Sequence, residues 1–179
     1  GLALGCDSVA HKETLLQKIY DEKLEIDCDT PLENLGYGNL VDQLYKKVAR
    51  PNVVNPIFLT EHPISLSPLA RANDDNPEIT DRFQLVINGA EIINAYSELV
   101  DPQEQERRLE VQAALKDNGD EEAMPMDHDY ISAMEVGMPP ISGWGMGIDR
   151  VVQLLTNSDN IKDVILFPLM RPLNEEKKD

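Results

Sequence analysis

Apolar positions recur at helical spacing in two stretches near the N-terminus. One pattern covers residues 11–24 and the other residues 37–51, where Pro51 ends it. The apolar stripes consist of Leu15, Leu16, Ile19 and Tyr20 in the first, and of Leu40, Val41, Leu44, Tyr45 and Val48 in the second. Proline and glycine between the stripes indicate a connector. The pattern predicts paired helices.

From about residue 55 the apolar pattern changes to short, strand-like runs. Residues 56–60 predict a short strand, and residues 62–80 form a long polar loop with several prolines. Asn88-Gly89 stands between two apolar runs and predicts a hairpin with a two-residue type I′ turn. If Ile87 pairs with Ala90, then Gln84 faces Ile93, and Gln84 and Glu91 become diagonal neighbours on one sheet face. Their oxygen atoms suit a hard cation.

Polar residues alternate further along the second strand of this hairpin. Asn94, Tyr96 and Glu98 occupy one face of a regular strand, and together they suit a cationic ligand with an aliphatic stem. Glu91 lies an odd number of positions from Asn94, so a β-bulge near residues 92–93 is needed to bring all four to one face. The alternative is an ordinary strand whose polar side chains face water.

Two helices follow. Asp101 as N-cap, Pro102 and Glu104 predict the start of the first, and Asp127 or Asp129 caps the second. The expected apolar side of the first helix consists of Leu109, Val111, Ala114 and Leu115, and Met134 is expected in the core. We expect the remaining charged groups to be solvated, namely Arg107, Arg108, Asp120, Glu121, Glu122, Asp127 and Asp129.

The segment GWGMGIDRVVQLL, residues 143–155, combines glycines with a helix start and an arginine. Gly145 and Gly147 allow a ligand to approach the backbone closely, and the helix directs its positive end toward that space. Arg150 in the first turn adds a planar cation that can bind phosphate or stack on a base. The segment predicts a nucleotide-phosphate site.

Composition and charge narrow the choice of function. The chain has 179 residues and a net charge of −17, which argues against binding a nucleic-acid backbone through this segment alone. It has two cysteines, Cys6 and Cys28, which we expect to be free thiols in a reducing compartment. No apolar run approaches membrane-spanning length and no signal peptide is visible, so we expect a cytoplasmic protein that does not contact membrane.

Several long motifs resemble one family. Residues 143–172, GWGMGIDRVVQLLTNSDNIKDVILFPLMRP, are similar to motif 3 of the class II aminoacyl-tRNA synthetases, and most similar to the lysyl enzymes. Residues 83–112 resemble the preceding strand pair and helix of those enzymes. HPISLSPLAR at residues 62–71 and DEEAMPMDHDYISAMEVGMPP at residues 120–140 resemble two further segments, and all four occur in the family's order.

The resemblance implies a role for each candidate residue. Arg150 corresponds to the catalytic motif 3 arginine that binds ATP, alongside Gly145 and Gly147. Glu91 corresponds to a carboxylate that holds Mg²⁺ near the ATP phosphates. The lysine pocket would be formed by Asn94, Tyr96 and Glu98, with Glu98 binding the ε-ammonium. Gln84 stands where the family has a second metal carboxylate.

The family also implies a fold and a set of partners. We expect an α+β fold with a mostly antiparallel sheet and flanking helices: residues 1–54 are a helical insertion and residues 55–179 the C-terminal part of the catalytic domain. The implied activity is ATP-dependent activation of lysine and its transfer to tRNA(Lys). Motifs 1 and 2 do not occur in these residues, so we expect the isolated chain to be inactive and a homodimer to form only when motif 1 is present. The alternatives are a relative that attaches lysine to a protein and a non-catalytic binding or regulatory module.

Overall fold

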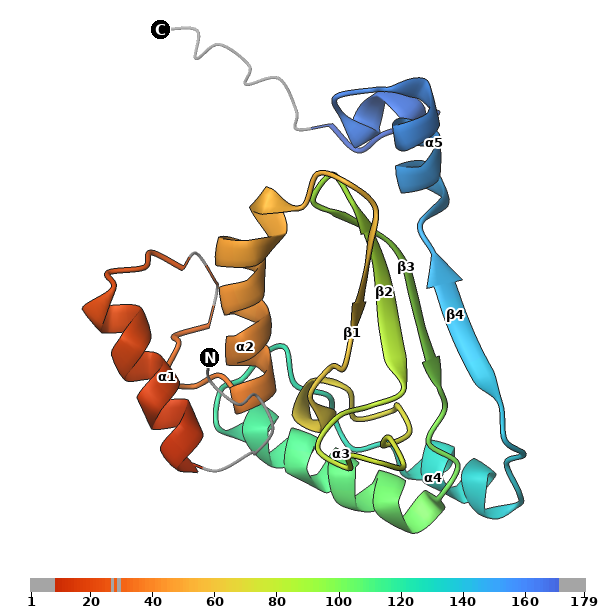
Figure 1. Cartoon of the computed structure of the whole chain (residues 1–179). Coiled ribbons are helices and arrows are strands. Elements are labelled where there is room, and N and C mark those ends of the chain that lie inside the picture. Colours follow the sequence, from red (N-terminus) through yellow and green to blue (C-terminus); the bar gives the residue numbers. More distant parts are fainter. Residues whose placement is uncertain (1–8, 27, 29, 171–179) are drawn as a thin grey trace, which may run out of the picture. The chain divides into compact units, whose positions relative to one another are not determined.

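In a computed structural model, residues 9–26, 28 and 30–170 are described, and they form five α-helices and a four-stranded sheet (Figure 1). The helices are α1 (Val9–Asp21), α2 (Tyr37–Leu44), α3 (Pro102–Asp117), α4 (His128–Glu135) and α5 (Ile148–Thr156). The strands are β1 (Ile57–Thr60), β2 (Arg82–Ile87), β3 (Ala90–Ser97) and β4 (Ser142–Met146), in the sheet order β1-β2-β3-β4. The pairs β1–β2 and β2–β3 are antiparallel. The predicted α+β class is confirmed.

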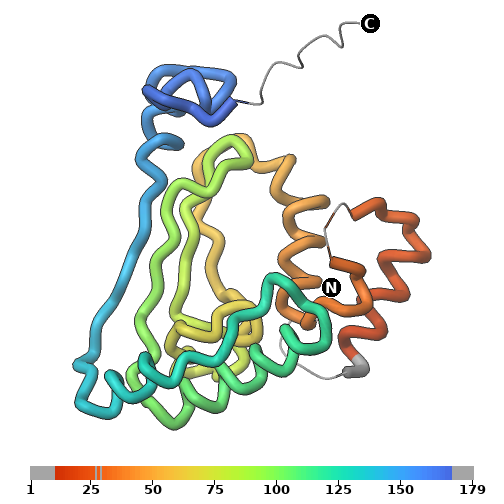
Figure 2. The backbone as a smooth tube through the Cα atoms, turned by 180° about the vertical axis from the view of Figure 1, so that it is seen from behind, coloured from red at the N-terminus to blue at the C-terminus, as the bar shows by residue number. Residues whose placement is uncertain are grey.

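The chain divides into two compact units, Gly1–Gly145 and Met146–Asp179. Within the first, α3 and α4 cross one end of the strands, as two opposite views show (Figures 1 and 2). The second contains α5 and the short 3₁₀ helix η4 (Ile161–Val164). The predicted division after residue 54 stays a prediction, and Cys6 lies outside the described residues.

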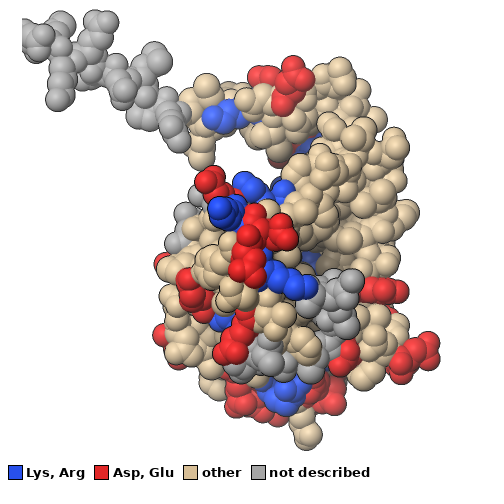
Figure 3. All heavy atoms as spheres, turned by 60° about the vertical axis from the view of Figure 1, so that its left-hand side comes forward, with Lys and Arg blue, Asp and Glu red and all other residues tan. Residues whose placement is uncertain are grey.

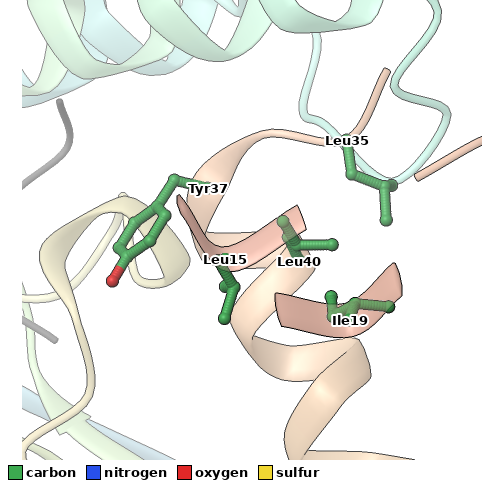
Figure 4. Close-up of a cluster of buried hydrophobic side chains, with 5 residues drawn as sticks. All are labelled: Leu15, Ile19, Leu35, Tyr37 and Leu40. Carbon is green, nitrogen blue, oxygen red and sulfur yellow. The ribbon is translucent and has the colours of Figure 1, made fainter. Parts of the chain in front are cut away.

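The two N-terminal helices pack through an apolar cluster. Figure 4 shows the buried side chains Leu15, Ile19, Leu35, Tyr37 and Leu40. Tyr20 and Val48, predicted in the same stripes, are exposed by 49% and 47%. The hydroxyl of Tyr20 donates to the Glu33 carboxylate at the surface. The prediction fails at Val48 because residues Tyr45–Ala49 form a π-helix, whose wider turn rotates later side chains off the α-helical stripe.

Helix α3 begins as the sequence predicts, but it buries a different set of side chains. Asp101 accepts hydrogen bonds from the amides of Gln103 and Glu104, which confirms the N-cap. Leu109 is buried, whereas Val111 is 52% exposed. The other buried side chains of α3 are polar: Gln105, Arg108 and Gln112. The helical spacing is therefore right, but polar residues occupy most of the inward face, and Arg108 is not solvated as predicted.

Two acidic residues after α3, Asp120 and Asp127, accept hydrogen bonds at the starts of other helices. Asp120 was expected in water with the other acids, and it is instead fully buried. Its carboxylate accepts from the amide of Gly36 at 2.7 Å and from the Asn39 side chain at 3.0 Å. Asp127 caps α4 by accepting from the amide of Tyr130, as predicted. Asp120 thus ties α2 to the segment after α3.

Charged side chains of both signs are interspersed over the face shown in Figure 3. Acidic side chains also gather along its lower edge, in keeping with the net charge of −17. None of the described helices is long and apolar enough to cross a membrane.

Candidate lysine and ATP site

A β-bulge organises the strand pair that carries most of the candidate residues. Leu85 pairs with Ile93 and Val86 pairs with Glu91, so Ile92 is the extra residue on β3. The bulge predicted near residues 92–93 is confirmed. The predicted pairing of Gln84 with Ile93 is wrong, because the extra residue moves Asn94 opposite Gln84.

The bulge brings polar side chains of β2 and β3 together on one face. The Gln84 amide donates to the Glu91 carboxylate, with 2.8 Å between Nε2 and Oε2. One step along, Arg82 Nε donates to Asn94 Oδ1 at 3.1 Å, and Arg82 also lies opposite Tyr96. Glu91 and Asn94 therefore share a face, as the parity argument required. The turn that starts this arrangement has the predicted left-handed backbone, with φ of 48° at Asn88 and 70° at Gly89.

Arg82 is a site residue that the sequence prediction missed. Besides Asn94, it binds the carbonyl of Leu66 at 3.2 Å and the hydroxyl of Ser67 at 2.8 Å. Burial lowers the pKa of Arg82, and the Glu91 carboxylate opposes that shift. Because Arg82 and Gln84 are two positions apart on one strand, period-two alternation would have placed Arg82 on the candidate face.

Glu98 lies just after β3, beside the first part of β4. Its amide donates to the carbonyl of Ile141 at 3.0 Å. A Cβ atom at Gly143 would lie 2.3 Å from Glu98 Oε1, so only glycine leaves the carboxylate in its place. Gly143 belongs to the glycine-rich segment that the sequence singled out, but its contact with Glu98 depends on the β3–β4 neighbourhood and could not be foreseen from spacing.

The surroundings of Glu98 are suited to a positive charge. Burial raises the pKa of the Glu98 carboxyl, because a partly buried place disfavours the ionised form. The pKa of Tyr96 is raised by burial and, secondarily, by the nearby Glu98 charge, and the same two causes act on Tyr130. Glu98 also lines a cavity of about 390 Å³ with Arg71, Ser97, Val100, Pro140, Ile141 and Ser142. A carboxylate beside two phenol rings is a site that an ammonium group would stabilise.

The glycine-rich segment divides between the two units. Gly145 ends the first, and a Cβ atom there would meet open space, so packing does not require glycine at this position. In the second unit, Gly147 is the N-cap of α5, and Arg150 lies in the first turn, as predicted. A Cβ atom at Gly147 would lie 3.3 Å from Arg150 Cδ, so the absent side chain leaves room for the arginine stem beside the helix start.

The donor set around Glu91 limits what kind of metal site it can form. Among the described residues, no three His, Cys, Asp or Glu side chains come together as metal ligands. Glu91 provides one carboxylate and Gln84 one amide, which is too few for a metal cage made by protein alone. Magnesium commonly uses one or two carboxylates together with substrate phosphates and water. The pair fits an ion that arrives with a nucleotide.

Comparison with known proteins assigns the family. The family model for class II tRNA synthetases (D, K and N) matches residues 7–171. The chain belongs to this family. Its resemblance to the lysyl branch is also confirmed, because the relatives described next carry that name.

Three curated lysine–tRNA ligases illustrate the similarity. Those of Cronobacter sakazakii and Escherichia coli are each 54% identical over 138 residues, which cover 77% of this chain and 27% of the relative. That of Helicobacter pylori is 46% identical over 170 residues, which cover 95% of this chain and 33% of the relative. The chain therefore spans roughly a third of the length of the curated relatives it matches.

Proposed function

We propose that this chain forms the lysine-binding face and the motif 3 segment of a lysine–tRNA ligase, which activates lysine with ATP and transfers it to tRNA(Lys). The observation that carries the proposal is the bulge at Ile92, which joins Glu91 and Asn94 on one face in a chain similar to lysine–tRNA ligases. The similarity favours this function over transfer of lysine to a protein and over a non-catalytic role. Binding of tRNA(Lys), a homodimer and a cytoplasmic location remain predictions.

Lysine recognition rests on Glu98, Tyr96 and Asn94. Glu98 would pair with the ε-ammonium, whose positive charge offsets the cost of burying the carboxylate. Tyr96 would pack against the aliphatic stem, and Asn94, held through its Oδ1 by Arg82, keeps its amide nitrogen for the ligand. An analogue without the ammonium would leave the partly buried Glu98 carboxylate without a cation, so the site would reject it.

ATP would be held by the glycine-rich segment. Arg150 supplies a guanidinium at the positive end of α5, and Gly147 leaves the backbone accessible beside it. Gly145, at the end of the other unit, would contribute a backbone that a ligand can approach. Glu91, with Gln84, would hold Mg²⁺, which neutralises phosphate charge when bound. The lysine carboxylate is itself the nucleophile toward the α-phosphate, so the protein's contribution is positioning and charge stabilisation.

The proposed function can be tested in a hybrid enzyme. In this hybrid, the chain replaces the segment of Escherichia coli lysine–tRNA ligase that it matches. Lysine-dependent ATP–pyrophosphate exchange by the hybrid would support the function, and its absence in a folded hybrid would contradict it. The decisive variant is Glu98→Gln, which keeps the side-chain shape and removes the charge.

Truncating one partner of a buried charge pair costs about 2–5 kcal/mol. At about 1.4 kcal/mol per tenfold, lysine kcat/KM should fall roughly 30- to 3000-fold in Glu98→Gln, while the KM for ATP changes little. Arg150→Ala should instead raise the KM for ATP. Glu110→Gln removes an exposed carboxylate from α3 and serves as the matched control. Lysine kinetics near wild type in Glu98→Gln would show that Glu98 does not bind the ammonium.

A further inference from the structure

Arg108 is a buried arginine on α3 that the proposed lysine and ATP contacts do not involve. Its side chain is 7% exposed, and its two ends have different partners. Nε donates to Glu104 Oε1 at 2.7 Å, and the terminal NH1 donates to the backbone carbonyl of Ala70 at 2.8 Å. A planar guanidinium can satisfy both acceptors at once, which the single nitrogen of lysine cannot do in the same geometry.

The carbonyl that Arg108 binds belongs to the loop segment Pro68–Arg71, which runs antiparallel to the end of β3. The amide of Leu99 donates to Leu69 at 2.9 Å, and the amide of Arg71 donates to Ser97 at 2.8 Å. Between these two bonds, Ala70 lies directly opposite Glu98 as a β-bridge pair. The position of Glu98 is therefore linked to that of residues 68–71.

Helix α3 holds the other edge of the same segment. The Leu69 carbonyl accepts from the Leu99 amide, whereas the carbonyls of Pro68 and Ala70 on either side of it accept from side chains of α3. Gln105 Nε2 donates to the Pro68 carbonyl at 3.1 Å, and Arg108 takes that of Ala70. Gln105 and Arg108 are three residues apart and so face the loop together. Figures 1 and 2 both show this loop, in yellow, against α3.

We propose that Arg108 is a positioning residue for lysine specificity: by fixing Ala70 it sets the place of Glu98 without touching the substrate. The inference rests on the proposed function only in that Glu98 binds lysine. The structural link from Arg108 through Ala70 to Glu98 stands independently of the reaction.

The structural link can be measured in the 179-residue chain by amide hydrogen exchange. Arg108→Met should speed hydrogen exchange at the Leu99 and Arg71 amides by about tenfold or more. The reason is that residues 68–71 lose the hydrogen bond from Arg108 to the Ala70 carbonyl, so both amide bonds open more often. Arg107→Met is the matched control, since Arg107 is 62% exposed and its hydrogen bonds go to the same Glu104, whereas Arg108 also binds the Ala70 carbonyl. Unchanged exchange at both amides in Arg108→Met would overturn the proposal, and Arg108→Lys gives the same test if the methionine variant does not fold.

The consequence for specificity is measured in the hybrid enzyme. Arg108→Lys should raise the KM for lysine about tenfold, while the KM for ATP and kcat stay within about twofold. This pattern is expected when a lysine-binding group is displaced, whereas loss of a catalytic group would lower kcat. A merely structural role would lower the folded fraction, and therefore kcat, with both KM values unchanged; that result would refute positioning. Failure of the proposed function is recognised separately, as a wild-type hybrid without lysine dependence or a Glu98→Gln variant with normal lysine kinetics.

Discussion

Replacing Asp120 with alanine should lower the free energy of unfolding of the chain by about 3–5 kcal/mol. The carboxylate is fully buried and accepts from three groups: the amide of Gly36 at 2.7 Å, Asn39 Nδ2 at 3.0 Å and the amide of Glu122 at 3.1 Å. Gly36 is the N-cap of α2 and has no side chain with which to satisfy that helix start. A Cβ atom there would lie 2.8 Å from Leu115 Cδ1, so any side chain at this position would require Leu115 to move.

The magnitude follows from what the alanine variant leaves behind. A hydrogen bond to a charged group contributes about 1.5–3 kcal/mol, and each buried donor without a partner costs about 1–3 kcal/mol. Three donors lose their acceptor, of which the Gly36 amide is buried and the other two are partly buried. The gross loss is therefore about 5 kcal/mol, and relief from burying the carboxylate returns part of it. The net cost of 3–5 kcal/mol is large beside a typical domain stability of about 5–15 kcal/mol.

Urea unfolding followed by circular dichroism gives the measurement. Asp117→Ala is the matched control, because Asp117 is an exposed acid three residues earlier and should change stability by less than about 0.5 kcal/mol. Asp120→Asn should cost about 2–3 kcal/mol, since its amide would place a donor against donors. A loss below about 1 kcal/mol in Asp120→Ala would mean that water or relaxation satisfies these groups and that the reasoning is wrong.

Two further predictions concern Glu98 in the hybrid enzyme. Gly143→Ala should push the Glu98 carboxylate aside and raise the KM for lysine at least about fivefold, with the KM for ATP unchanged; equal kinetics would show that the close approach does not matter. Burial raises the pKa of Glu98 above the ordinary 4.5, and lysine binds the ionised form, so lysine kcat/KM should fall as pH drops through a midpoint above 4.5. Glu98→Gln should abolish that acid limb, and an unchanged pH profile in this variant would assign the limb to another group.

Local features of this fold were predictable because their causes lie within a few residues. Asn88-Gly89 predicted the turn, since both residues accept a left-handed backbone, and Asp101 with Pro102 predicted the start of α3. The bulge at Ile92 was also predicted from the sequence, but only on the assumption that Glu91 and Asn94 lie on the same face of the strand. Side chains alternate strictly between the two faces of a regular strand. Two residues an odd number of positions apart, such as Glu91 and Asn94, can therefore share a face only if a bulge adds one residue between them.

The two failures that concern charged side chains, Arg108 and Asp120, have a common physical origin in contacts between distant segments. Arg108 and Asp120 were both expected in water because isolated charged residues usually are. Arg108 is buried because the Ala70 carbonyl, 38 positions away, needs a donor, and Asp120 because Gly36, 84 positions away, needs an acceptor. In both cases this partner is a backbone group. Since nearly every residue has the same backbone groups, the residue types in the sequence do not indicate which one will be the partner.

The long loop of residues 62–80 acquires a definite role from these contacts. Such a loop, rich in polar residues and proline, suggests a mobile binding element. It is instead held at two points of the proposed lysine-binding face: Arg82 joins it to Asn94, and Arg108 binds the part opposite Glu98. Asn94 on β3 and Glu98 just after β3 lie four positions apart, so the loop contacts both ends of the face that would bind lysine. The two arginines use charge to satisfy backbone carbonyls in a buried place, and the loop they hold becomes part of the rigid support for the pocket.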